Sequence, residues 1–77
     1  MNGFIIEITR DDETGRSGQV AERWIGITAT ARAMILKLPG ERPSVVDRGA
    51  RVLARARHLG LKDGEVRQLE DDEPRGP

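Results

Sequence analysis

Hydrophobic and polar residues alternate near the start of the chain. In residues 4–9, one side of an extended segment collects Phe4, Ile6 and Ile8, while Ile5 falls on the opposite side. A period of two together with β-branched side chains is typical of a strand. The first element that the pattern predicts is therefore a β-strand.

A stretch of turn-forming residues, 10–18, separates this strand from a second one at about 19–28. A loop of that length between two strands favours an antiparallel hairpin. The aliphatic face of the second strand includes Ile25, and Trp24 lies on the other face. If the aliphatic face meets a helix, Trp24 lies on an outer face, which Ile5 can join if the register allows it.

The hydrophobic period becomes helical between Ser44 and Leu59. The apolar face of this segment consists of Val45, Gly49, Val52, Leu53, Ala56 and Leu59. Ser44 and Asp47 have the spacing of a capping box, and Gly60 suits the position just after a helix. The pattern predicts one long amphipathic helix, packed against the hairpin.

Two shorter segments complete the predicted fold. Residues 30–38 contain good helix formers, but Met34, Leu36 and Leu38 would also share one side of a strand; we favour a short helix, ended by Pro39-Gly40. Residues 65–70 predict a short edge strand anchored by Val66.

Together these elements predict a single small α+β domain over residues 1–70. Residues 71–77 form an acidic tail with two prolines, for which we expect disorder. A chain of 77 residues buries too little surface for high stability, and the small predicted sheet leaves edges and one face open. Both features leave room for a homodimer.

The residue content excludes several classes of function. The chain has no cysteine, which excludes disulfides, a thiolate nucleophile and cysteine-bound metal. His58 is the only histidine, so neither a catalytic triad nor a zinc site can be assembled. We expect no signal peptide, because no basic start is followed by an apolar run, and the apolar runs are too short to span a membrane. We expect no catalytic residue, no cofactor, no metal and no membrane association.

Charge is segregated along the chain although the net charge is zero. Residues 41–62 carry six bases and two acids, and residues 63–77 carry six acids and two bases. On the predicted helix, Arg48, Arg51 and Arg55 step by three and four and would form a row able to clamp phosphates.

The alternative for this arginine row is an ordinary solvated face, with Asp47 paired to Arg51. A nucleic-acid binder usually carries net positive charge and stacking aromatics. The chain has neither, so a nucleic-acid regulator is the second function that we consider.

A second candidate surface combines acids with a tryptophan. Asp11, Asp12 and Glu13 are adjacent at the predicted hairpin turn, and Glu22 and Trp24 follow on the second strand. Tryptophan is enriched at binding hot spots, although a core position under the helix explains Trp24 equally well. These five residues are the candidate partner-binding set.

The layout resembles that of the small phage-encoded anti-CRISPR proteins that inhibit type I effector complexes. The similarity lies in the opening strand Gly-Phe-Ile-Ile-Glu-Ile-Thr at residues 3–9, the acidic turn at residues 11–13 and the Ala/Arg helix at residues 50–58.

This resemblance implies a non-enzymatic inhibitor in the cytoplasm of a bacterial host. It would bind an effector subunit and block target DNA by presenting the acids of the turn, and Glu22, to a basic surface. The arginine row departs from such a simple mimic of DNA.

Overall fold

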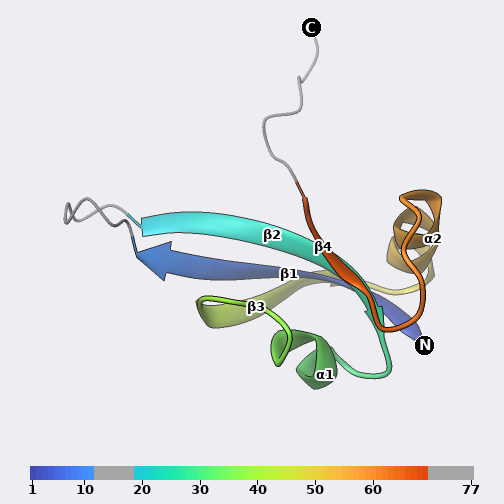
Figure 1. Ribbon diagram of the computed structural model, residues 1–77, viewed down its shortest axis with the longest axis horizontal. Helices are drawn as coiled ribbons and strands as arrows, with labels where there is room; N and C mark the ends of the chain where they lie inside the picture. Colours follow the sequence, from blue (N-terminus) through green and yellow to red (C-terminus); the bar gives the residue numbers. More distant parts are fainter. Residues whose placement is uncertain (12–18, 70–77) are drawn as a thin grey trace, which may run out of the picture.

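The computed structural model describes residues 1–11 and 19–69, and within them the protein is α+β. The chain order is β1 (Asn2–Asp11), β2 (Gln19–Thr28), α1 (Ala31–Ile35), β3 (Glu41–Arg48), α2 (Ala50–His58) and β4 (Val66–Leu69). The four strands form one antiparallel sheet in the order β3-β1-β2-β4 (Figure 1). The prediction for the tail, residues 71–77, falls outside the described part.

The predicted hairpin is confirmed: its first strand is longer than the pattern indicated, and its second has the predicted bounds. β1 and β2 pair over their full length, from Asn2 opposite Thr28 to Asp11 opposite Gln19. Because paired residues share a face, Ile5 lies beside Ile25, and Ile6 lies beside Trp24. The expectation that Ile5 joins Trp24 is therefore wrong: the register places them on opposite faces.

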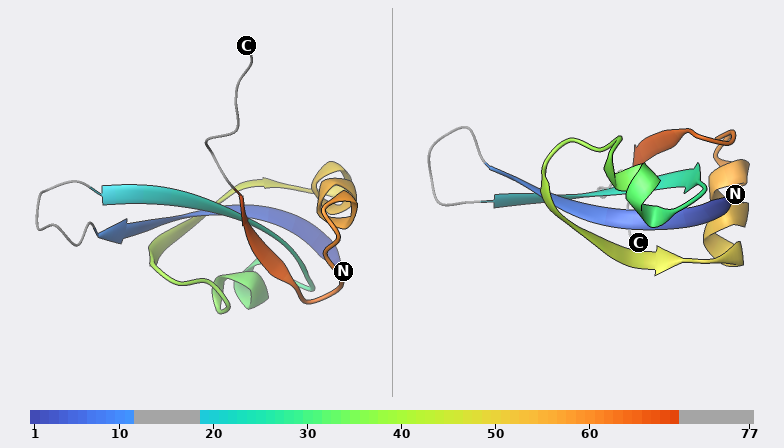
Figure 2. Two further views of the ribbon diagram at one scale, coloured as in Figure 1. Left: turned by 45° about the horizontal axis from the view of Figure 1, so that its top comes forward. Right: turned by 90° about the horizontal axis from the view of Figure 1, so that it is seen from below.

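Each face of the sheet is covered by one helix (Figure 2). The buried cluster on the α2 side contains Ile5, Ile25, Ile27, Val52 and Ala56. The buried cluster on the α1 side contains Phe4, Ile6, Ile8 and Met34. The core is therefore two thin apolar layers on either side of the β1–β2 pair, which explains why β1 carries buried hydrophobic residues on both faces, Ile5 on one and Phe4, Ile6 and Ile8 on the other.

The predicted long helix is wrong in its first part, because residues 41–48 form strand β3 on the outer side of β1. Ser44 does not cap a helix; it lies opposite Glu7 in the sheet. Two β-branched residues, Val45 and Val46, favour extended backbone, and pairing with β1 satisfies their peptide groups.

Gly49 separates the two elements. Its φ of 120° is strained for any residue with a side chain, and it stands at the N-cap of α2 without a side-chain cap. Its N–H donates to Gly3 O (3.1 Å), and its carbonyl accepts from Leu53 N–H (3.0 Å). The apolar face predicted for residues 50–59 is confirmed at Val52 and Ala56, which are buried.

β3 is an irregular edge strand. Its pairing with β1 shifts register between Ile5 and Ile6 and again between Glu7 and Thr9. Near the second shift, Arg42 has a φ of 55°, and Pro43 follows it. All eight residues of the strand are exposed. Irregular pairing and a proline are common means of blunting a sheet edge.

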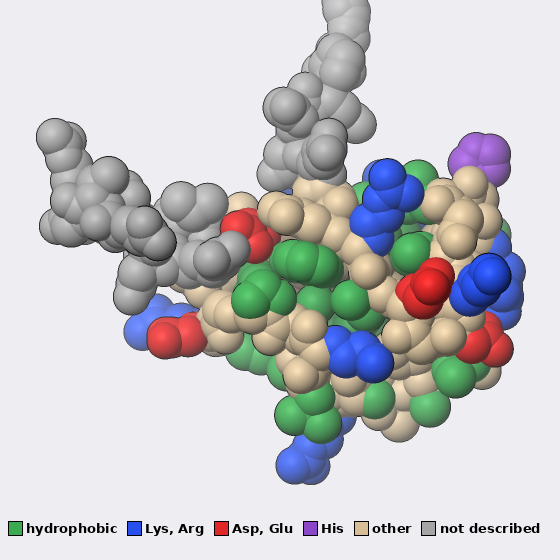
Figure 3. Space-filling model, viewed as in Figure 1, with side chains coloured by type: hydrophobic (Ala, Val, Ile, Leu, Met, Phe, Trp, Pro, Cys, Tyr) green, Lys and Arg blue, Asp and Glu red, His purple; other side chains and the backbone are tan. Residues whose placement is uncertain are grey.

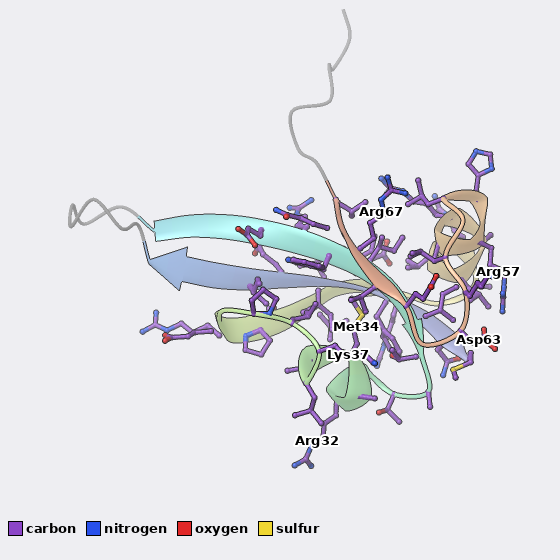
Figure 4. The ribbon with its side chains drawn as sticks, viewed as in Figure 1. Arg32, Met34, Lys37, Arg57, Asp63 and Arg67 are labelled. Carbon is purple, nitrogen blue, oxygen red and sulfur yellow. The ribbon has the colours of Figure 1, made fainter. Side chains whose placement is uncertain are left out.

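α1 is the short helix that we favoured for residues 30–38, and the strand alternative is not observed. Thr30 caps it, because its hydroxyl oxygen accepts from Ala33 N–H at 3.1 Å. Met34 is its one fully buried side chain and points from α1 toward the sheet, whereas Arg32 points away (Figure 4).

The chain after α2 returns to the sheet and adds β4 beside β2, as the edge-strand prediction required. Arg57 on α2 forms an ion pair with Asp63 at 3.2 Å, and Gly64 N–H donates to Ile27 O at 2.7 Å (Figure 4). Arg67 on β4 donates to Leu59 O at 3.2 Å. These bonds tie the end of α2 to the last strand.

Candidate functional site

Trp24 is held on the α1 side of the sheet by the regular pairing of β2. Its indole packs against the cluster that contains Ile6 and Met34, and the side chain is half-buried. Its Nε1–H donates to Glu22 Oε1 over 3.4 Å, a long bond between residues two apart on the same face. The tryptophan therefore has a fixed apolar base and a polar edge near the surface.

Side chains from two distant elements continue the apolar surface around this tryptophan. Leu38, just after α1, and Val66, in β4, are partly buried against the same cluster. Gly26 makes room for this arrangement, since a Cβ there would lie 2.6 Å from a methyl group of Val66. We name Glu22, Trp24, Leu38 and Val66 the Trp24 face.

Hydrophobic side chains gather in the middle of the surface where β2, β4 and α1 meet, with charged groups around them (Figure 3). Sequence analysis found Glu22 and Trp24 but missed Leu38 and Val66. The only sign of this arrangement in the sequence is Gly26, which is two positions after Trp24 and therefore on the same face of the strand. No spacing in the chain could indicate which distant residues fill the room that a glycine leaves.

The acidic turn can be placed only in part. Asp11 ends β1 opposite Gln19. This pair lies three positions along the hairpin from the pair of Ile8 and Glu22, a separation of roughly 10 Å at strand spacing. Asp12 and Glu13 lie outside the described residues. That these acids act together with Glu22 stays a prediction.

The predicted arginine row is divided between two elements. Arg51 and Arg55 are exposed on α2 and line a hollow of about 230 Å³ together with Asp47, Ile5 and Val52.

Arg48 ends β3 and lines a different hollow, of about 290 Å³, with Asn2, Phe4 and Gly49. The three guanidinium groups therefore do not form one helical stripe, because residue 48 is not helical.

Asp47 does not form the predicted pair with Arg51. Its Oδ1 accepts from the backbone N–H of Arg48 at 2.8 Å. Within residues 1–11 and 19–69, ion pairs join Glu7 to Arg23 (3.5 Å) and Arg57 to Asp63 (3.2 Å). His58 is exposed near the end of α2.

Other kinds of site were considered on the same residues. In the described part of the chain, no group of three or more His, Asp or Glu side chains is arranged to hold a metal ion. None of the helices described is long and apolar enough to cross a membrane.

Comparison with known proteins found no matching family model, no matching curated protein and no matching solved structure.

Proposed function

We propose that this protein is a small protein-binding inhibitor that contacts its partner through the Trp24 face. The observation that carries the proposal is a half-buried tryptophan, rigidly placed on a strand and surrounded by partly buried apolar side chains. Interfaces concentrate their energy in such anchors, because the tryptophan offers a large apolar area and loses little conformational freedom on binding.

Glu22 supports the choice of partner chemistry. Its carboxylate lies beside the indole of Trp24. An apolar anchor with a carboxylate next to it complements a partly apolar, basic surface. The resemblance to anti-CRISPR proteins suggests such a partner, namely a DNA-binding subunit of a type I effector complex in a bacterial cytoplasm.

The experiment measures binding of target duplex DNA by a purified type I effector complex in the presence of this protein. Trp24→Ala should abolish inhibition, and Glu22→Gln should weaken it. Leu36→Ala is the matched control, because Leu36 is a hydrophobic side chain that is 79% exposed and packs against neither buried cluster. Circular dichroism checks that each variant folds, and Trp24→Phe gives a milder change should the alanine variant unfold.

The outcome that contradicts the proposal is inhibition that survives in folded Trp24→Ala, or that is lost equally in Leu36→Ala. A regulator that binds nucleic acid through its arginines is the second candidate, because Arg51 and Arg55 line one hollow. Tight, salt-sensitive binding of duplex DNA by the protein alone would favour that candidate instead.

A further inference from the structure

Two arginines on successive turns of α2 line one hollow. Arg51 and Arg55 are four residues apart, so their Cβ atoms lie about 5–6 Å from each other on the helix surface. Both line the hollow of about 230 Å³ between α2 and β3. Ile5 and Val52, which are almost fully buried, form its apolar base.

These two arginines have no charged partner among the residues that the structure describes. In the part of the chain that the structure describes, neither guanidinium makes an ion pair or a hydrogen bond, unlike Arg23, Arg57 and Arg67. Asp47 shares the hollow, but its Oδ1 is engaged by the backbone of Arg48. The hollow therefore presents two planar donor groups to an external acceptor.

We propose that this hollow binds carboxylate side chains of an acidic segment in a partner protein. A guanidinium donates two parallel hydrogen bonds to a carboxylate, and two such groups can hold two neighbouring acids or clamp one. A volume of about 230 Å³ falls below the roughly 300–1,000 Å³ of small-molecule pockets, so it suits single side chains.

The same geometry disfavours a nucleic acid. Asp47 opposes any anion in the hollow, so the distinction rests on the number of cations that the ligand must engage. The cation that would continue the track, Arg48, lines another hollow. An acidic side chain can reach Arg51 and Arg55 singly, without a continuous track of cations.

This site is independent of the Trp24 face. Ile5, at the base of the hollow, and Trp24 lie on opposite faces of the β1–β2 pair. A loss of carboxylate binding would therefore leave the proposed inhibitor function untouched, and the reverse also holds.

The test titrates a fluorescent hexaglutamate peptide with the full chain and follows anisotropy at low salt. A hexaglutamine peptide, inorganic phosphate and duplex DNA are the comparison ligands. The double variant Arg51→Gln, Arg55→Gln should weaken hexaglutamate binding at least about tenfold. Arg32→Gln is the matched control, because Arg32 is exposed on α1 and points away from the sheet (Figure 4). Both variants change surface side chains, and circular dichroism verifies their folding.

The proposal is supported if the double variant loses hexaglutamate binding, Arg32→Gln retains it, and the wild type does not bind hexaglutamine. Equal weakening by Arg32→Gln, no hexaglutamate binding, or tighter binding of phosphate or DNA would overturn it. Tighter peptide binding after neutralising Glu70, Asp71, Asp72 and Glu73 would also overturn it, because the hollow would then belong to the chain's own acidic run.

Discussion

Two glycines set how closely the layers of this small domain approach each other. A Cβ on Gly3 would lie 2.5 Å from Leu53 Cα and 2.7 Å from the carbonyl carbon of Val52, both backbone atoms of α2. A Cβ on Gly26 would meet Val66 on the opposite side of the sheet. Backbone atoms cannot rotate away as side chains do, so the position of α2 depends on Gly3.

Gly3→Ala should therefore destabilise the protein by about 1–3 kcal/mol, the usual cost of overpacking. Urea unfolding followed by the fluorescence of Trp24 measures the change. Ser44→Ala, at an exposed position of β3, should leave the midpoint near that of the wild type. An unchanged midpoint in Gly3→Ala would show that α2 does not pack on β1 as described.

At the scale of elements, α1 is attached to the sheet by very little. It has five residues, and Met34 is its only buried side chain. Isolated helices of this length are unstable in water, so packing must hold α1 in place. The contact between Met34 and the cluster of Phe4, Ile6 and Ile8 supplies that packing.

Met34→Ala should lower the free energy of unfolding by about 2–5 kcal/mol. It should also let α1 detach before the sheet itself unfolds. Hydrogen exchange of the amides at residues 33–36 should rise more than exchange in β1. Leu36→Ala is the control, because 79% of that side chain is exposed. Equal protection of α1 in wild type and Met34→Ala would mean that other contacts hold the helix.

The elements that sequence analysis predicted correctly are those with one dominant pattern. The alternation in residues 4–9 and 19–28 indicated the hairpin, and the helix formers in residues 30–38 indicated α1. Residues 44–48 carried conflicting signals, because Ser44 and Asp47 imitate a capping box while Val45 and Val46 prefer a strand. Pairing with β1, which lies far away in the sequence, decided the conflict, and no local pattern contains that information.

The residues of the candidate site also divide into those that a local sequence pattern indicates and those that only tertiary packing brings together. Trp24 and Glu22 were found because both lie on a regular strand, where alternation fixes their shared face. Leu38 and Val66 were missed, because they reach that face through tertiary packing. The separation of Arg48 from Arg51 and Arg55 followed from the strand that replaced the start of the predicted helix.

For the molecule as a whole, β3 is the longer of the two edge strands of the sheet. It carries Val45 and Val46, which are 38% and 43% exposed. Pro43 removes one backbone donor from the strand, and the two register shifts interrupt its regular course. These features oppose the addition of a further strand.

Pro43→Val should therefore increase self-association, because it supplies a β-branched residue with a backbone N–H. Light scattering during mild heating should show larger species than in the wild type. Pro39→Val is the matched control, since Pro39 is exposed but lies outside the strand. Equal scattering from both variants would show that the edge is not what limits association.

The strand order also has a consequence for synthesis on the ribosome. β2 emerges early, but its neighbour β4 is the last element of the sheet to be made. At about 5–20 residues per second, the ribosome needs roughly 2–8 s to pass from Thr28 to Val66. Throughout that interval, one side of β2 lacks its hydrogen-bonding neighbour and Gly26 lacks the side chain of Val66. The sheet is therefore completed only when β4 has been made, and the Trp24 face is finished after the other elements that the structure describes.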